Sequence, residues 1–152
     1  MYKSAVDHSR KEIVKRVEKE QQSVHDYASY VPIGNAAKKL NAWKKQGAEI
    51  LYLTSRRIPN EIKQIKAVLK RHDFPEGKLL FRQKSEEYKD VAERIVPDIL
   101  VEDDCESIGG IDEMTITYVR PEIKKRIKSV VVKEFGGIDN LPDLITDLAN
   151  MN

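Results

Sequence analysis

The sequence predicts an α/β fold, a three-layer α/β/α sandwich built on a mostly parallel, Rossmann-like sheet. Short apolar runs alternate with amphipathic helical segments through the middle of the chain, and the connections between them are short. Strands that alternate with helices usually pair in parallel and are covered by helices on both faces. At 152 residues the chain has the length of one domain, so we expect a single domain over residues 1–152.

The predicted helices carry an apolar stripe and span residues 9–23, 36–46, 59–71 and 86–95. The predicted strands are short apolar runs at residues 50–53, 78–81 and 99–101. Ser9 and Glu12 have the spacing of a capping box, which favours a helix start there. Gly47 is typical of the residue that ends a helix. We expect the helix over 9–23 to lie on the surface, within a small helical insertion near the N-terminus.

The last third of the chain is predicted from weaker patterns. Residues 114–119 alternate between apolar and polar and predict a strand, and Pro121 suits the first turn of a helix over 121–126. Residues 130–132 fit either an edge strand or the end of that helix, and 142–149 predict a terminal helix. The sequence Gly-Gly-Ile-Asp occurs at 109–112 and at 136–139, which we interpret as two turns.

Charge and cysteine content argue against several classes of partner. Lys and Arg number 27 against 25 Asp and Glu, a net charge of +2, and the two signs are interleaved. This balance predicts neither nucleic acid nor an anionic membrane as a partner. Cys105 is the single cysteine, so an internal disulfide and a cysteine-based zinc site are excluded. No apolar run approaches the ~18 residues of a membrane span, and we expect a cytoplasmic protein.

The candidate site lies where the predicted strands end, because ligands of parallel α/β sheets bind beyond the carboxyl ends of the strands. Thr54, Ser55 and Arg56 follow the first strand, and Asp103 and Asp104 end the third. Hydroxyl and N–H groups at 54–56 suit phosphate oxygens, whereas adjacent carboxylates suit Mg²⁺. Lys89, in the helix before the third strand, has an ammonium that would neutralise a phosphate.

Residues 32–110 resemble the haloacid dehalogenase-like superfamily. The strand at 50–53 with Thr54 is similar to its second motif, Lys89 to its third, and 99–104 to its fourth. The resemblance implies a phosphohydrolase in which Thr54 and Lys89 hold the phosphoryl group. It also implies that Asp103 and Asp104 hold Mg²⁺ and that the substrate is a phosphorylated small molecule.

The first motif of that family, an Asp-x-Asp that supplies the nucleophile from the central strand, does not precede Thr54. The closest candidate is Asp7, within residues 5–9, which we interpret as a surface residue. Either the chain starts downstream of that motif, with residues 5–30 as a small cap, or it is a shortened relative. In the second case the strand at 130–132 or a partner chain fills the gap in the sheet.

Two functions follow from these alternatives. With an upstream nucleophile, we expect Mg²⁺-dependent hydrolysis of a phosphate ester, whereas the chain as written is inactive or binds phosphate weakly. The alternative is a non-catalytic binding or interaction domain, for instance a homodimer, on the same scaffold. The sequence alone therefore predicts neither whether the protein is an enzyme nor which substrate it would use.

Overall fold

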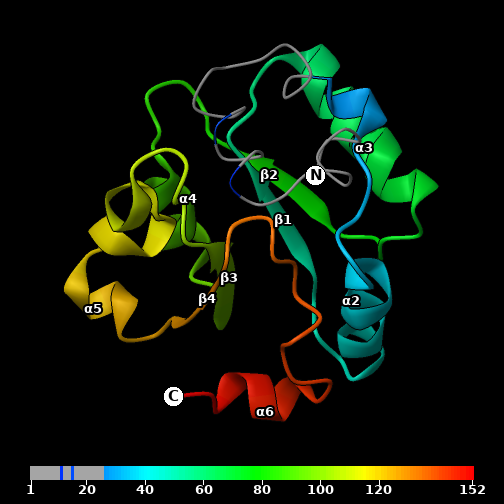
Figure 1. Cartoon of the computed structure of the whole chain (residues 1–152). Helices are drawn as coiled ribbons and strands as arrows, with labels where there is room; N and C mark the ends of the chain where they lie inside the picture. Colours follow the sequence, from blue (N-terminus) through cyan, green and yellow to red (C-terminus); the bar gives the residue numbers. More distant parts are fainter. Residues whose placement is uncertain (1–10, 12–14, 16–25) are drawn as a thin grey trace.

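The computed structural model describes residues 11, 15 and 26–152, and the chain forms a mixed α/β structure (Figure 1). The predicted helix over 9–23, Asp7 and most of the predicted insertion over 5–30 lie outside the described residues. The α-helices are α2 (Ala36–Lys45), α3 (Pro59–Arg71), α4 (Tyr88–Ile95), α5 (Pro121–Lys124) and α6 (Ile145–Ala149). The strands are β1 (Leu51–Thr54), β2 (Lys78–Phe81), β3 (Ile99–Asp103) and β4 (Lys128–Val132). Short 3-10 helices are η3 (Tyr27–Ser29), η4 (Gly110–Glu113) and η5 (Thr115–Tyr118).

The strands form two separate parallel pairs. β1 pairs with β2, and β3 pairs with β4. In the part of the chain that the structure describes, no backbone hydrogen bond joins β1 to β3, so the two pairs do not form one sheet. Parallel pairing is therefore confirmed, whereas the single continuous sheet of the prediction is not formed.

The start of β2 lies very close to β1, and a glycine makes this approach feasible. A Cβ atom placed on Gly77 would lie 2.1 Å from the carbonyl oxygen of Ile50. Any side chain at position 77 would therefore push the two strands apart. The glycine, with Pro75, lies in the connection between α3 and β2.

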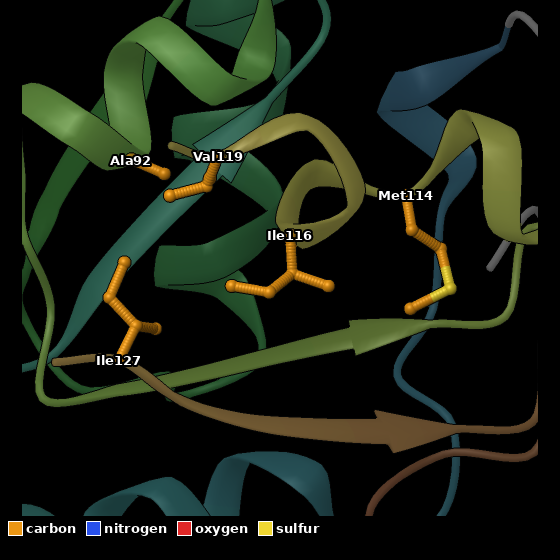
Figure 2. Close-up of a cluster of buried hydrophobic side chains, with 5 residues drawn as sticks. All are labelled: Ala92, Met114, Ile116, Val119 and Ile127. Carbon is orange, nitrogen blue, oxygen red and sulfur yellow. The ribbon is translucent and has the colours of Figure 1, made fainter. Parts of the chain in front are cut away.

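Helices cover both faces of the β3–β4 pair. On one face, Ile99 and Val101 of β3 pack against Trp43 of α2 and Leu148 of α6. On the other face, Leu100 packs against a second cluster from α4, η5 and the segments around them (Figure 2). The cluster consists of Ala92, Met114, Ile116, Val119 and Ile127. Side chains of β3 thus pack into two hydrophobic clusters, one on each face of this strand pair.

β4 resolves the alternatives for residues 130–132. The strand begins at Lys128, separated from α5, and pairs with β3 along its whole length. Those residues therefore form a strand and not the end of a helix. Because β4 pairs with β3 and not with β1, it does not fill the gap between the two strand pairs.

The strand predicted over residues 114–119 is wrong, since this segment contains η5. The carboxylate of Glu102 accepts the backbone N–H groups of Thr115, at 2.7 Å, and Ile116, at 3.0 Å. These bonds satisfy donors at the start of a helical turn, which a helix otherwise leaves unpaired. Four helices are also shorter than predicted, because α4 starts at Tyr88, α6 starts at Ile145, α5 ends at Lys124 and α2 ends at Lys45.

Candidate functional site at the ends of the strands

Tyr88, the first residue of α4, lies near residues that follow β1 and β2. The guanidinium carbon of Arg82, which follows β2, lies 5.0 Å from the centroid of the Tyr88 ring. Burial raises the pKa of Tyr88, while the side chain of Ser55, which follows β1, and the charges of Arg82 and Arg56 oppose the rise.

The start of α4 is fixed by a local hydrogen bond. The backbone N–H of Glu87 donates to Oδ2 of Asp90 at 2.8 Å, which satisfies a donor just before the helix. This bond sets where the helix begins and therefore where Tyr88 stands. In the sequence, Tyr88 falls on the apolar face of the predicted helix, and nothing there signals its polar contact.

At the end of β1, the three predicted phosphate ligands form a tight turn. The hydroxyl oxygen of Thr54 accepts the backbone N–H of Arg56 at 3.2 Å. The guanidinium carbon of Arg56 lies 5.0 Å from the centroid of the Tyr27 ring, so η3 supports this side chain. The turn therefore places Arg56 against Tyr27 and Ser55 near Tyr88, with Thr54 at its base.

Lys89 is next to Tyr88 but has a different neighbour. Its ammonium lies 3.5 Å from Oε2 of Glu87, and its side chain is partly exposed. Within residues 26–152, no hydrogen bond joins Lys89 to Thr54 or Ser55. The predicted grouping of Lys89 with the β1 turn is therefore not formed by direct contact.

Asp103 and Asp104 point to different partners. Oδ1 of Asp103 accepts the backbone N–H of Cys105 at 2.8 Å. Oδ2 of Asp104 lies 3.0 Å from the ammonium of Lys133, and its Oδ1 accepts the backbone N–H of Glu134 at 3.1 Å. Asp104 therefore connects the loop after β3 to the residues after β4.

These contacts fit a magnesium ion poorly at Asp104, because the Lys133 ammonium already occupies the position of a cation. The described ranges contain no group of three or more His, Cys, Asp or Glu side chains that could hold a metal ion. Asp103 is the better ligand of the two, because it is exposed and Cys105 engages only one of its oxygens.

The thiol of Cys105 is not an activated nucleophile. Burial raises its pKa to about 12, and the nearby carboxylate of Asp103 contributes to the rise. Since the thiolate is the reactive form, the thiol stays protonated and unreactive at neutral pH. The side chain packs against the cluster of Figure 2.

Arg82 is the second residue that sequence reasoning missed. It directly follows β2, so the rule that pointed to Thr54 and Asp103 at strand ends would also have selected it. The proximity of Tyr88 to Ser55 had no such signal, because it depends on how α4 packs against the end of β1.

Comparisons with protein-family models, curated proteins and solved structures found no match to this chain. The resemblance to haloacid dehalogenase-like proteins thus rests on the sequence motifs at residues 50–54, Lys89 and 99–104. Among the described helices, none is both long and apolar enough to cross a membrane.

Proposed function

We propose that the protein binds a phosphate group of a small molecule at the carboxyl ends of β1, β2 and β3. The observation that carries this proposal is that Arg56 and Arg82 follow two paired strands, since Thr54 of β1 pairs with Phe81 of β2, and that Arg82 packs against Tyr88. Two guanidinium groups and the hydroxyl groups of Ser55 and Tyr88 supply charge and hydrogen-bond donors of the kind that bind phosphate. The same residues include no carboxylate nucleophile, so binding is the function that they support most directly.

We further propose that the scaffold is a haloacid dehalogenase-like three-layer sandwich, with a fifth parallel strand between β1 and β3. β1 is only half-buried although its residues Leu51 and Leu53 are apolar, and its edge away from β2 has no strand partner in the described part of the chain. Exposed edges of this kind are normally paired or covered. A strand there would join the two pairs into one sheet.

Hydrolysis of a phosphate ester would need an aspartate nucleophile on that added strand. Thr54, Ser55 and Arg56 would then hold the phosphoryl oxygens, and Lys89 would assist after leaving Glu87. A magnesium ion would offset charge in the transition state. It would bind through Asp103, and through Asp104 once Lys133 has moved aside.

The alternative, a non-catalytic interaction domain, is favoured by the same unpaired edge of β1. In that case a partner chain, including a second copy of this chain, supplies the missing strand. Turnover of p-nitrophenyl phosphate in the presence of Mg²⁺ would exclude this alternative. A stable dimer in light scattering, without turnover, would support it.

The test of the proposed binding site is calorimetric titration with inorganic phosphate at constant ionic strength. We expect Arg56→Ala to weaken binding about tenfold or more, because it removes a charge-assisted hydrogen bond. Arg57→Ala is the matched control, since Arg57 is an exposed arginine next in sequence. Equal effects of the two substitutions, or no binding by the unsubstituted protein, would refute the site.

A further inference from the structure

Arg82 has a buried polar atom without a partner. Its Nε atom is inaccessible to solvent and makes no hydrogen bond among the described residues, while its guanidinium lies over the Tyr88 ring. A buried donor without an acceptor costs free energy, and the cost is greater for a charged group. Such atoms are uncommon in native proteins, where a bound ion or water often satisfies a donor of this kind.

Arg56 is placed in the same way on the neighbouring strand. Thr54 of β1 pairs with Phe81 of β2, so the residues that follow these two strands are neighbours in space. The guanidinium carbon of Arg56 lies 5.0 Å from the centroid of the Tyr27 ring. Each arginine thus packs against a tyrosine ring, a contact that orients a planar guanidinium and leaves N–H donors at its edge.

Among the described residues, neither arginine forms an ion pair with a carboxylate. The ion pairs within those ranges include neither Arg56 nor Arg82. Arg82 packs against the Tyr88 ring, and both positive charges oppose the rise in the pKa of Tyr88 that burial causes. Within the described part of the chain, the site therefore combines the hydroxyl groups of Tyr88 and Ser55 with two positive charges that form no ion pair.

We propose that Arg82 is a ligand-binding residue that forms, with Arg56, a two-arginine clamp for a phosphate dianion. This inference rests on the proposed function and adds Arg82 and Tyr88 to its site. A phosphate group carries up to two negative charges near neutral pH and has oxygens enough to accept from both guanidinium groups. A carboxylate has one charge and two oxygens, so the clamp favours phosphate. Because Nε is covered, binding also requires a small movement of the Arg82 side chain.

The experiment is titration of the full chain with inorganic phosphate, by calorimetry at constant ionic strength. We expect Arg82→Ala to weaken binding at least tenfold, and Arg82→Lys to weaken it about threefold or more, because lysine keeps the charge but lacks the planar fork. Arg126→Ala is the control, since this exposed arginine precedes β4 at the opposite end of the strands, and it should change the affinity less than twofold.

The two proposals fail in different ways. If Arg56→Ala weakens binding and both Arg82 variants bind within twofold of the unsubstituted protein, the clamp is refuted while the phosphate site stands. If the unsubstituted protein binds no phosphate, both are refuted. Should Arg82→Ala fail to fold by circular dichroism, the Arg82→Lys variant decides the question alone. Acetate, titrated in parallel, should bind at least tenfold more weakly than phosphate, and equal affinity would contradict the charge argument.

Discussion

Glu134 offers a quantitative test of how the loop after β3 is held. Its side chain is only 8% exposed. One carboxylate oxygen accepts the backbone N–H of Ser107 at 2.8 Å, and the other accepts the Ser107 hydroxyl at 2.6 Å. Ser107 is itself only 7% exposed, so water does not replace a lost acceptor. The pair therefore anchors the loop after β3, which begins with Asp104, to the residues after β4.

Glu134→Ala removes two hydrogen bonds to a charged group and leaves two buried donors on Ser107 unpaired. At about 1.5–3 kcal/mol for each such bond, less the cost of burying the carboxylate, we expect a loss of about 2–4 kcal/mol. For a chain of this size, that loss corresponds to a fall in Tm of about 4–16 °C. Ser107→Ala loses only the hydroxyl bond to the carboxylate and should cost about 1.5–3 kcal/mol.

The assay is urea unfolding followed by circular dichroism, with a shift in midpoint at an unchanged slope. Glu76→Ala is the control, because Glu76 is exposed in the turn before β2, and its effect should stay within about 0.5 kcal/mol. If Glu134→Ala destabilises the protein no more than Glu76→Ala does, the loop is not anchored by this carboxylate.

Other contacts give three further predictions. Trp43→Ala should lower the free energy of unfolding in urea by about 3–5 kcal/mol, because Trp43 is 3% exposed and its indole N–H donates to a backbone carbonyl. A loss below about 1 kcal/mol would contradict the position of Trp43 in the core. Burial opposes ionisation of the Asp104 carboxyl group, but the hydrogen bonds from Lys133 and from a backbone N–H outweigh this effect and lower the pKa of Asp104. The ionised carboxylate therefore stabilises the folded protein above the unfolded pKa of ~3.9, and this stabilisation is lost as the pH falls through the lower pKa of the folded state. The stability gap between the unsubstituted protein and Asp104→Asn should therefore shrink below about pH 4, and a gap independent of pH would refute this reasoning. With a pKa of about 12, Cys105 should be alkylated by iodoacetamide at about pH 8 far more slowly in the folded than in the urea-unfolded chain, and equal rates would contradict its burial.

Local patterns in the sequence predicted the central elements well. β1, α3, β2 and β3 lie within a residue or two of their predicted bounds, because each is either a short apolar run or a helix with a clear apolar face. The error at residues 114–119 has a non-local cause. Alternation favoured a strand, yet Glu102 binds the N–H groups that begin η5, and nothing local to that segment signals this contact.

Contacts at the candidate site depend in the same way on distant residues. The rule for strand ends selected Ser55 and Arg56, and Arg56 packs against Tyr27 of η3. The partner of Asp104 could not be predicted, because Lys133 reaches it only once β4 has paired with β3. Residues 130–132 had two interpretations in the sequence, and the contacts that decide between them are all made with residues far away along the chain.

The measurement that tests the central claim most directly is a titration of the ¹⁵N-labelled protein with inorganic phosphate, followed through backbone amide chemical shifts. We expect saturable shifts at residues 54–56 and 82–88, with Lys44 and Glu49, at the opposite ends of β1 and β2, unchanged. Shifts centred elsewhere, or an absence of saturation, would show that these strand ends are not a phosphate site.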